Sequence, residues 1–375
     1  MKIGFDAKRA YQNFTGLGNY SRDLIEHLIK EYSENEYFLF APKDSKNSRL
    51  DFLSNYDNTQ SVFPHNKLNK TFKGLWRTIN MEKSIIKNDV DIFHGLSNEI
   101  PRVKNKKIPY IVTIHDLIFK RFPRNYRSID RKIYNIKYKY AVKHADLTIA
   151  ISEQTKQDIV EFYKINPESI KVIYQTCHEN FRKEYSQEEI NLTKKKFNLP
   201  KEFILNVGTI ETRKNLISII NAMSVMKMDV PLVVVGKKTQ YINFLKIQMK
   251  KMNFDSKKII FLEDVSIDEL PIIYSLSSLF LYPSLFEGFG IPILEALNCK
   301  TPVISSKGSC FQEAGGDFSK YIDSENKEEF AFQIEECLTN TKLRESMIIQ
   351  GLKHADNFQP NKISKQLIDV YESLV

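Results

Sequence analysis

Short runs rich in β-branched and aromatic residues alternate with helical patterns from one end of this chain to the other. The first run is KIGFDA, and the second half of the chain opens with FILNVG. Strands that alternate with helices in this way form parallel sheets built from β-α units, so the sequence predicts an α/β fold. We expect strands at 2–7, 36–42, 91–95, 109–115, 146–151, 171–175, 203–208, 231–236, 258–263, 279–284 and 302–306.

The length of the chain suits two domains. Its 375 residues are enough for two hydrophobic cores of ordinary size. The segment NLTKKKFNLPKE is polar and basic and lacks a sustained apolar period, so we place a linker near 180–200. The predicted parts are an N-terminal domain at 1–190, a C-terminal domain at 200–360 and a last helix at 361–375. Helices in the first half are expected at 18–32, 70–88, 126–144 and 153–163.

The composition excludes several classes of protein. Hydrophobic residues make up 42% and charged residues 27%, as in globular rather than disordered chains. The start MKIGFDA reads as a strand and not as a signal peptide, and the apolar runs are far shorter than the roughly 20 residues of a membrane-spanning helix. The cysteines are scattered without a C-x-x-C pair, which favours reduced thiols and a cytoplasmic location. They are Cys177, Cys299, Cys310 and Cys337.

Positive charge is concentrated in one stretch of the first half. The chain has a formal net charge of +9, and thirteen lysines and arginines lie between Arg102 and Lys143 against two acidic residues. Aromatic residues are interleaved with this charge. The combination is typical of a surface that sits on anionic lipid, with a solvated helix face as the alternative. Nucleic acid is not expected as a partner, since no nucleic-acid-binding motif accompanies the charge.

The segment FLYPSLFEGFGIPILEAL at 280–297 combines a strand, a glycine turn and the start of a helix. Pro292 can occupy the first position of a helix, where a missing N–H costs nothing. A helix N-terminus offers free N–H groups to phosphate, while Glu287 and Glu295 offer acceptors to hydroxyl groups. A nucleotide sugar presents both kinds of group. The alternative is a tight strand-to-helix connection without a ligand.

The same segment resembles the E-x7-E signature of retaining glycosyltransferases of family 4, which have the GT-B architecture. The resemblance covers nearly the whole chain and implies two Rossmann-like domains with parallel sheets facing a central cleft. It also implies that the last helix crosses back to the first domain. The other matching blocks are TGLGNYSRDLIEHL at 15–28, TIHDL at 113–117, ADLTIAISEQTKQDI at 145–159, FILNVGTIETRKNLISII at 203–220, TPVISS at 301–306 and EAGGD at 313–317.

This resemblance assigns roles to residues that hold the donor. Arg213 and Lys214 match a pair that binds the diphosphate, whose charge grows as the sugar departs. Glu287 matches the residue that meets the sugar hydroxyls, and Glu295 matches the one that binds the ribose. The remaining donor-binding candidates are glycines of two loops and the residues around the helix start, namely Gly16, Gly18, Gly208, Gly288, Phe289, Gly290 and Ile291.

Further candidates lie in the first half of the chain. His115 matches a family histidine near the anomeric centre, so the expected catalytic residues are His115, Arg213, Lys214 and Glu287. Asp116 is a candidate for contact with the acceptor. Four basic residues are added as candidates on the acceptor side, namely Lys106, Lys107, Arg124 and Arg127.

Two positions depart from the family pattern. Lys300 stands where relatives usually carry glycine, and Gln312 stands where they usually carry proline. No D-x-D metal motif occupies a donor position. We therefore expect neither a metal ion nor a cofactor, because cationic side chains and helix ends replace the metal in this fold.

The resemblance implies a retaining hexosyltransferase of the cytoplasm, with a peripheral position at the inner face of the plasma membrane as the alternative location. GDP-mannose is the first choice of donor, and a growing glycan linked to a lipid diphosphate is the expected acceptor. A UDP- or dTDP-sugar is the alternative donor. The alternative functions are a sugar-nucleotide epimerase of the same fold and a binding protein without catalysis.

Overall fold

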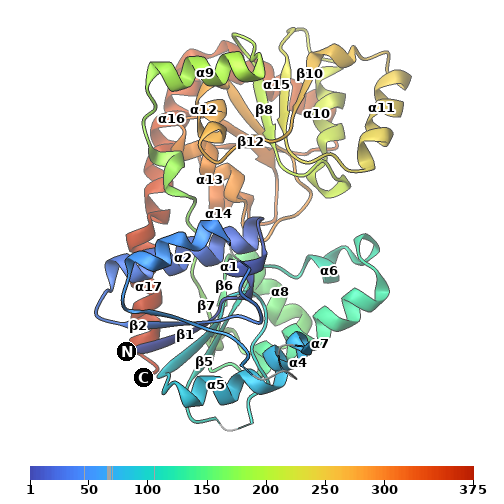
Figure 1. The fold of residues 1–375 in the computed structure, drawn as a ribbon. Coiled ribbons are helices and arrows are strands. Elements are labelled where there is room, and N and C mark those ends of the chain that lie inside the picture. Colours follow the sequence, from blue (N-terminus) through green and yellow to red (C-terminus); the bar gives the residue numbers. More distant parts are fainter. Residues whose placement is uncertain (46, 66–68, 70, 105) are drawn as a thin grey trace. The chain divides into compact units, whose positions relative to one another are not determined.

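The computed structural model describes residues 1–45, 47–65, 69, 71–104 and 106–375 (Figure 1). The chain divides into two compact units. Unit 1 comprises Met1–Thr176 together with Gln359–Val375, and unit 2 comprises Cys177–Phe358. The last helix therefore belongs to the same unit as the N-terminus.

Unit 1 is built on a parallel sheet that has seven strands in the described part of the chain. Their spatial order is β3-β2-β1-β4-β5-β6-β7, and every pair is parallel. The prediction missed β3, because TQSV is short, mostly polar and at the edge of the sheet. The strands are β1 (Lys2–Asp6), β2 (Glu36–Phe40), β3 (Thr59–Val62), β4 (Ile92–Gly95), β5 (Tyr110–Ile114), β6 (Leu147–Ala150) and β7 (Ile170–Val172).

Helices cover both faces of this sheet. One buried cluster joins the sheet to α1, α2 and α17, and another joins it to α5, α7 and α8. The helix predicted at 70–88 is interrupted by a π-helical turn at Trp76–Asn80, and its first residue lies outside the described residues. The helices are α1 (Lys8–Gln12), α2 (Gly16–Glu31), α4 (Lys73–Leu75), α5 (Met81–Lys87), α6 (Ile118–Arg121), α7 (Ser128–His144), α8 (Glu153–Tyr163) and α17 (Pro360–Glu372).

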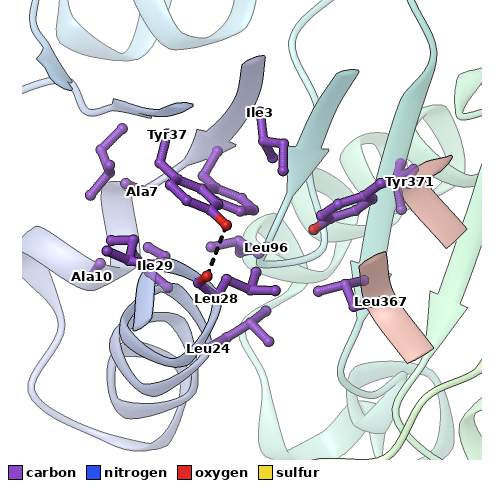
Figure 2. Close-up of a cluster of buried hydrophobic side chains, with 14 of the residues drawn as sticks. Ile3, Ala7, Ala10, Leu24, Leu28, Ile29, Tyr37, Leu96, Leu367 and Tyr371 are labelled. Atoms are coloured by element: carbon purple, nitrogen blue, oxygen red, sulfur yellow. Dashed lines mark hydrogen bonds between the residues drawn. The ribbon is translucent and has the colours of Figure 1, made fainter. Parts of the chain in front are cut away.

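Helix α17 completes the core of unit 1. Figure 2 shows Leu367 and Tyr371 of α17 in the same cluster as Leu24 and Leu28 of α2. Tyr37 of β2 is fully buried there and donates a hydrogen bond of 2.8 Å to the Leu28 carbonyl. Burial of these apolar side chains stabilises the packing of α17 on the core of unit 1.

Unit 2 has a second parallel sheet, with six strands among the described residues. Their order is β10-β9-β8-β11-β12-β13. The α/β prediction of two parallel sheets is confirmed, although the short edge strand β13 was not predicted. The strands are β8 (Ile204–Val207), β9 (Leu232–Val235), β10 (Ile259–Leu262), β11 (Leu279–Tyr282), β12 (Val303–Ser306) and β13 (Lys320–Ile322).

A helix occupies most of the segment that the sequence analysis read as a linker. Helix α9 (Gln187–Phe197) begins with a capping box, in which Ser186 and Glu189 bond each other's backbone N–H. The prediction was wrong here because it relied on apolar periodicity, whereas α9 is mostly exposed. The other helices of unit 2 are α10 (Leu216–Met223), α11 (Tyr241–Lys251), α12 (Glu269–Leu276), α13 (Ile291–Asn298), α14 (Phe311–Gly315), α15 (Lys327–Thr339) and α16 (Thr341–Ala355).

The strand order reverses once in each sheet. In unit 1 the chain leaves β1 toward β2 and later returns to place β4 on the other side of β1. In unit 2 the reversal lies between the neighbouring strands β8 and β11. Ligands of open parallel sheets bind at such reversal points, beyond the carboxyl ends of the strands.

Candidate functional site

The reversal point of unit 2 brings together two loops that are far apart in the sequence. Arg213 and Lys214 lie in a 3₁₀ turn at Thr212–Lys214, shortly after the carboxyl end of β8. Glu287 lies in the loop that follows β11. Because β8 and β11 are neighbouring parallel strands, their following loops meet at one edge of the sheet.

The two cations converge on one carboxylate oxygen. Lys214 Nζ lies 2.7 Å from Glu287 Oε1, and Arg213 Nη1 lies 2.6 Å from the same atom. The Ser284 hydroxyl donates a third contact to Oε1 at 2.6 Å. Glu287 is only 9% exposed, so this is a charged cluster almost withdrawn from water.

Three further residues hold the cations, and none of them was predicted to belong to the site. Lys214 donates to the Tyr282 hydroxyl at 2.7 Å and lies over the Tyr282 ring. Arg213 pairs with Glu211 at 2.8 Å and also donates to the Phe286 carbonyl. The position of Tyr282 at the carboxyl end of a buried strand was the one signal that pointed to it.

The electrostatics of the cluster keep Glu287 and Arg213 charged. Burial alone would raise the pKa of Glu287, but Lys214 and Arg213 beside it lower that pKa to about 2. Burial likewise opposes the charge on Arg213, and the neighbouring Glu287 raises the Arg213 pKa above its ordinary value. The cluster is therefore an ion pair network at any neutral pH.

Glycines allow the backbone to turn tightly around this cluster. Gly208 has a φ of +148°, and Gly290, which caps the N-terminus of α13, has a φ of +108°. These conformations suit glycine because a side chain would be strained there. Next to Gly290, Phe289 buries its ring against Phe358, so only its backbone is left to face a ligand. Gly288 and Ile291 flank the same turn and are partly exposed.

Helix α13 begins at Ile291, so Pro292 occupies the second position of its first turn. Glu295 lies one turn further along, where it accepts a hydrogen bond of 3.0 Å from the Tyr274 hydroxyl. Burial and the nearby Glu295 both raise the pKa of Tyr274, which keeps its proton available for this bond. The tyrosine thus fixes the orientation of the carboxylate.

A cavity of about 420 Å³ lies at the carboxyl ends of β9 and β10, on the same edge of the sheet. It was not anticipated from the sequence. Gly236 at its rim has a φ of +156°, and a Cβ there would come within 1.9 Å of the Gly208 carbonyl. The other lining residues are Val235, Lys237, Leu262, Glu263, Asp264 and Val265.

The two departures from the family pattern have local explanations. Lys300 follows α13 with a φ of +61°, the left-handed conformation that glycine adopts most easily. Its side chain is exposed, so the lysine costs backbone strain but no packing. Gln312 is exposed and donates to Asp317 at 2.9 Å.

His115 lies at the carboxyl end of β5 in unit 1 and is fully engaged by its own unit. Its ring nitrogens contact the Leu96 carbonyl at 2.8 Å and the Gln175 amide at 3.0 Å, and its backbone N–H donates to Asn98. Burial lowers the pKa of His115 to about 4, so its ring is neutral. A neutral ring held in this way can orient a ligand but does not supply a charge.

The other candidates of unit 1 are dispersed. Gly18 sits in the first turn of α2, where a Cβ would come within 1.9 Å of the Asn13 carbonyl, whereas Gly16 has open space around it. Asp116 is half-buried, and its carboxylate accepts from the Ile118 N–H at 3.0 Å.

The four basic candidates do not form one group. Lys106 and Lys107 precede β5 at its amino end, where Lys106 pairs with Asp146 at 2.8 Å. Arg124 and Arg127 follow α6, beyond the carboxyl end of the same strand. All four are exposed.

Across the described residues, no group of three or more histidine, cysteine or acidic side chains is arranged to hold a metal ion. Likewise, no helix in the described part of the chain is long and apolar enough to cross a bilayer.

Comparison with protein families assigns both halves of the chain. Residues 14–177 match the model described as Glycosyltransferase Family 4, and residues 187–354 match the model described as Glycosyl transferases group 1.

Several similar proteins are bacterial mannosyltransferases. The chain is 24% identical to the O-antigen chain mannosyltransferase B of Escherichia coli over 390 aligned positions, which span the whole of both proteins. It is 29% identical to the O-antigen chain mannosyltransferase RfbU of Salmonella typhimurium over 229 positions. That alignment covers 61% of this chain and 59% of RfbU.

Solved structures share the fold at low identity. Sucrose-phosphate synthase from Thermosynechococcus elongatus superimposes with a TM-score of 0.76 at 17% identity, covering 100% of this chain and 99% of that one. Anabaena Alr3699/HepE, solved in complex with UDP and glucose, gives a TM-score of 0.75 at 18% identity over the whole of both chains. The chain is therefore a glycosyltransferase of family 4, with the two Rossmann-like domains of the GT-B fold.

Proposed function

We propose that this glycosyltransferase moves a mannosyl unit from GDP-mannose to a growing glycan, with retention of anomeric configuration and without a metal ion. The observation that carries the proposal is the cluster of Arg213, Lys214 and Glu287 at the reversal point of unit 2. The site offers two cations, the Glu287 carboxylate as an acceptor for sugar hydroxyl groups, and the N-terminus of α13. These are the groups that a sugar diphosphate requires.

Glu287 pairs with both cations through a single oxygen, and Glu211 supplies a second carboxylate to Arg213. A diphosphate offers several charged oxygens to Lys214 and Arg213, so binding exchanges one set of charge-assisted contacts for another. The exchange releases Glu287 from part of its pairing, and its carboxylate is then free to accept from the sugar hydroxyls. One carboxylate thus serves as a placeholder for the phosphate and as a ligand for the sugar.

The chemical step needs stabilisation of the leaving group above all. The bond between the anomeric carbon and the diphosphate oxygen breaks, and its electron pair stays on that oxygen. The acceptor hydroxyl attacks from the same face, and its proton passes to the leaving phosphate. Lys214 and Arg213 hold the growing negative charge in a site shielded from water, which is the role a metal ion has in other transferases.

The cavity at the carboxyl ends of β9 and β10 supports the proposal that the donor carries guanine as its base. Glu263 and Asp264 line it with carboxylates, which can accept from the two N–H groups on the pairing edge of guanine. Uracil and thymine offer one N–H on that edge, so they suit two carboxylates less well. Glu295, held by Tyr274, is the acceptor for the ribose hydroxyls.

The acceptor is proposed from the relatives. O-antigen mannosyltransferases are among the most similar proteins, so we propose a glycan carried on a lipid diphosphate at the cytoplasmic face of the inner membrane. His115 and Asp116 of unit 1 are the proposed contacts to the transferred sugar and to the acceptor hydroxyl.

A panel of GDP-, UDP- and dTDP-sugars in a thermal-shift experiment tests the donor. GDP-mannose is expected to raise the Tm by mass action, and Glu295→Ala is expected to weaken its binding about tenfold, by loss of a charged hydrogen-bond acceptor. Glu345→Ala is the matched control, because Glu345 is an exposed glutamate on α16. A larger rise in Tm with a UDP- or dTDP-sugar would identify that nucleotide sugar as the donor instead of GDP-mannose. No change in Tm across the panel would contradict donor binding.

A further inference from the structure

The charge cluster of unit 2 contains a second carboxylate, Glu211, on its solvent side. Glu211 directly precedes the 3₁₀ turn at Thr212–Lys214, and its Oε1 lies 2.8 Å from Arg213 Nη2. The side chain of Glu211 is 40% exposed, whereas Glu287 is buried. Arg213 therefore lies between an inner carboxylate and an outer one.

The two terminal nitrogens of Arg213 have different surroundings. Nη1 donates to the Phe286 carbonyl at 2.7 Å and contacts Glu287 Oε1 at 2.6 Å, so both of its hydrogens are engaged. Nη2 has Glu211 as its one hydrogen-bond partner among the described residues. An anion that approaches Arg213 from solvent therefore reaches it at Nη2, in competition with Glu211.

The formal charges of the cluster cancel. Lys214 and Arg213 carry two positive charges, and Glu287 and Glu211 carry two negative charges. A diphosphate would therefore meet a cluster without net charge unless one of the carboxylates moves away.

The two carboxylates differ in how easily they can move. Glu287 is buried and accepts from Ser284 at 2.6 Å in addition to its two cations, so its displacement would leave buried charges unpaired. The Glu211 carboxylate contacts only Arg213 within the described part of the chain, and water already reaches it. Its displacement costs little, because a partly exposed ion pair contributes little to stability.

We propose that Glu211 is a displaceable carboxylate that occupies the diphosphate position on Arg213 and thereby sets the affinity of the site for nucleoside diphosphates. This inference rests on the proposed function, since it requires that a diphosphate binds Arg213 and Lys214. When the donor binds, a phosphate oxygen replaces Glu211 at Nη2, and Glu211 turns into solvent while Glu287 keeps its contact with Ser284. After transfer, Glu211 pairs with Arg213 again and favours release of the nucleoside diphosphate.

Replacement of Glu211 by glutamine isolates the effect of its charge. Glutamine has nearly the same shape, and its amide oxygen can still accept a hydrogen bond from Nη2. The neutral amide competes less well for Arg213 and does not repel phosphate. The cluster of the Glu211→Gln variant has a net positive charge, so we expect it to bind diphosphate more tightly than the unchanged protein.

Isothermal titration calorimetry with inorganic pyrophosphate, in the absence of metal ions, tests the proposal on the full chain. Glu211→Gln is expected to lower the Kd about fivefold, because one competing charge is removed. The difference should shrink as the salt concentration rises, since salt screens charges near the surface. Glu336→Gln is the matched control, because Glu336 forms a partly exposed pair at 3.4 Å with Lys320, at the amino end of β13.

Steady-state kinetics adds a measurement that a purely structural role of Glu211 would not reproduce. Glu211→Gln is expected to lower the KM for the donor about fivefold and to leave kcat nearly unchanged, because the added attraction applies to the bound donor as much as to the transition state. Inhibition by the nucleoside diphosphate should become stronger by a similar factor. Damage to the site would instead raise KM and lower kcat.

The other outcomes of the titration overturn the proposal. Equal Kd values for Glu211→Gln and the unchanged protein would show that Glu211 does not compete with phosphate. Weaker binding by the variant would show that Glu211 holds Arg213 in place for the phosphate. Both results concern Glu211 alone, because pyrophosphate carries neither base nor sugar. Absence of binding to either protein would instead contradict the diphosphate site of the proposed function, and this inference with it.

Discussion

Both sheets place a buried cluster of opposite charges at the point where their strand order reverses. In unit 1, Arg77 bonds Asp6 at 2.7 Å, at the end of β1, and Glu99 at 2.6 Å, after β4. In unit 2, Lys214 bonds Glu287 at 2.7 Å, with one residue after β8 and the other after β11. The same topology and nearly the same distances therefore occur twice.

The two clusters differ in what surrounds them. Asp6 is 1% exposed and Arg77 6%, and Lys137 supplies a second cation to Glu99 at 2.9 Å. Burial would raise the pKa of Glu99, but Arg77 and then Lys137 lower it. In unit 1 the charges are saturated by the protein and join β1, β4 and two helices. In unit 2 they border glycine turns and a helix N-terminus. The charge cluster of unit 1 thus holds structural elements together, and we call it the lock. The charge cluster of unit 2 is a candidate ligand site.

Replacing the central cation of the lock gives the largest expected effect. Arg77→Met leaves Asp6 buried without its partner, so the free energy of unfolding should fall by about 3 to 5 kcal/mol. Urea denaturation followed by Trp76 fluorescence measures it, because Trp76 is the one tryptophan of the chain and is buried in unit 1. Lys30→Met, which breaks an exposed pair with Glu26, should cost less than about 1 kcal/mol. A similar cost for both variants would end the distinction between lock and surface pair.

The corresponding change in unit 2 should act on catalysis first. Lys214→Met is expected to lower the transfer rate about 100-fold or more, through lost stabilisation of the leaving diphosphate. Lys258→Met is the control, since Lys258 forms a surface pair with Asp229 at the amino end of β10. Transfer of labelled sugar under saturating donor measures the rate. A near-normal rate in Lys214→Met would make the second cluster another lock.

Acid should destabilise unit 1 at a higher pH than it affects the charge cluster of unit 2. Burial lowers the pKa of His94 to about 3 and that of His115 to about 4. The unfolded chain protonates histidine near pH 6.5, so their contribution to stability is complete above that pH and falls as the pH drops toward 4. Glu287, with its pKa lowered to about 2, keeps its contribution above pH 4.5 and loses it only below.

Unit 1 is therefore expected to lose about 4 kcal/mol by pH 5, about 2 kcal/mol for each histidine, while the unit 2 cluster is unchanged. Urea midpoints from Trp76 fluorescence across this range measure the effect. His115→Gln should flatten the pH dependence, because one of the two titrating groups is gone. If the urea midpoint of His115→Gln depended on pH as steeply as that of the unchanged protein, groups other than His115 would govern the acid sensitivity.

Local patterns predicted most of the fold. The strands that were missed are β3 and β13, which are short edge strands with little apolar signal. Helix α9 was missed although its capping box, Ser186 with Glu189, was legible in the sequence. The helix expected at 70–88 is interrupted by a π-helical turn at Trp76–Asn80, where Trp76 and Arg77 are buried.

The chemistry of the candidate site was foreseeable only in part. The motifs named Arg213, Lys214, Glu287 and Glu295, and roles for these residues remain predictions. The pairing of Lys214 with Glu287 was not foreseen, and neither were the contributions of Tyr282 and Tyr274. Those contacts join residues from separate loops, and no local spacing rule reaches so far.

The sequence by itself determined the alternation of strands and helices, the two parallel sheets and the membership of the family, because each depends on periodicity or on short contiguous motifs. Only the tertiary structure decided which charges meet. Parallel pairing of β8 with β11 closes a gap of 73 residues between Lys214 and Glu287, and pairing of β1 with β4 sets Arg77 between two carboxylates. Burial and charge pairing depend on which elements become neighbours in space, and that information is not local.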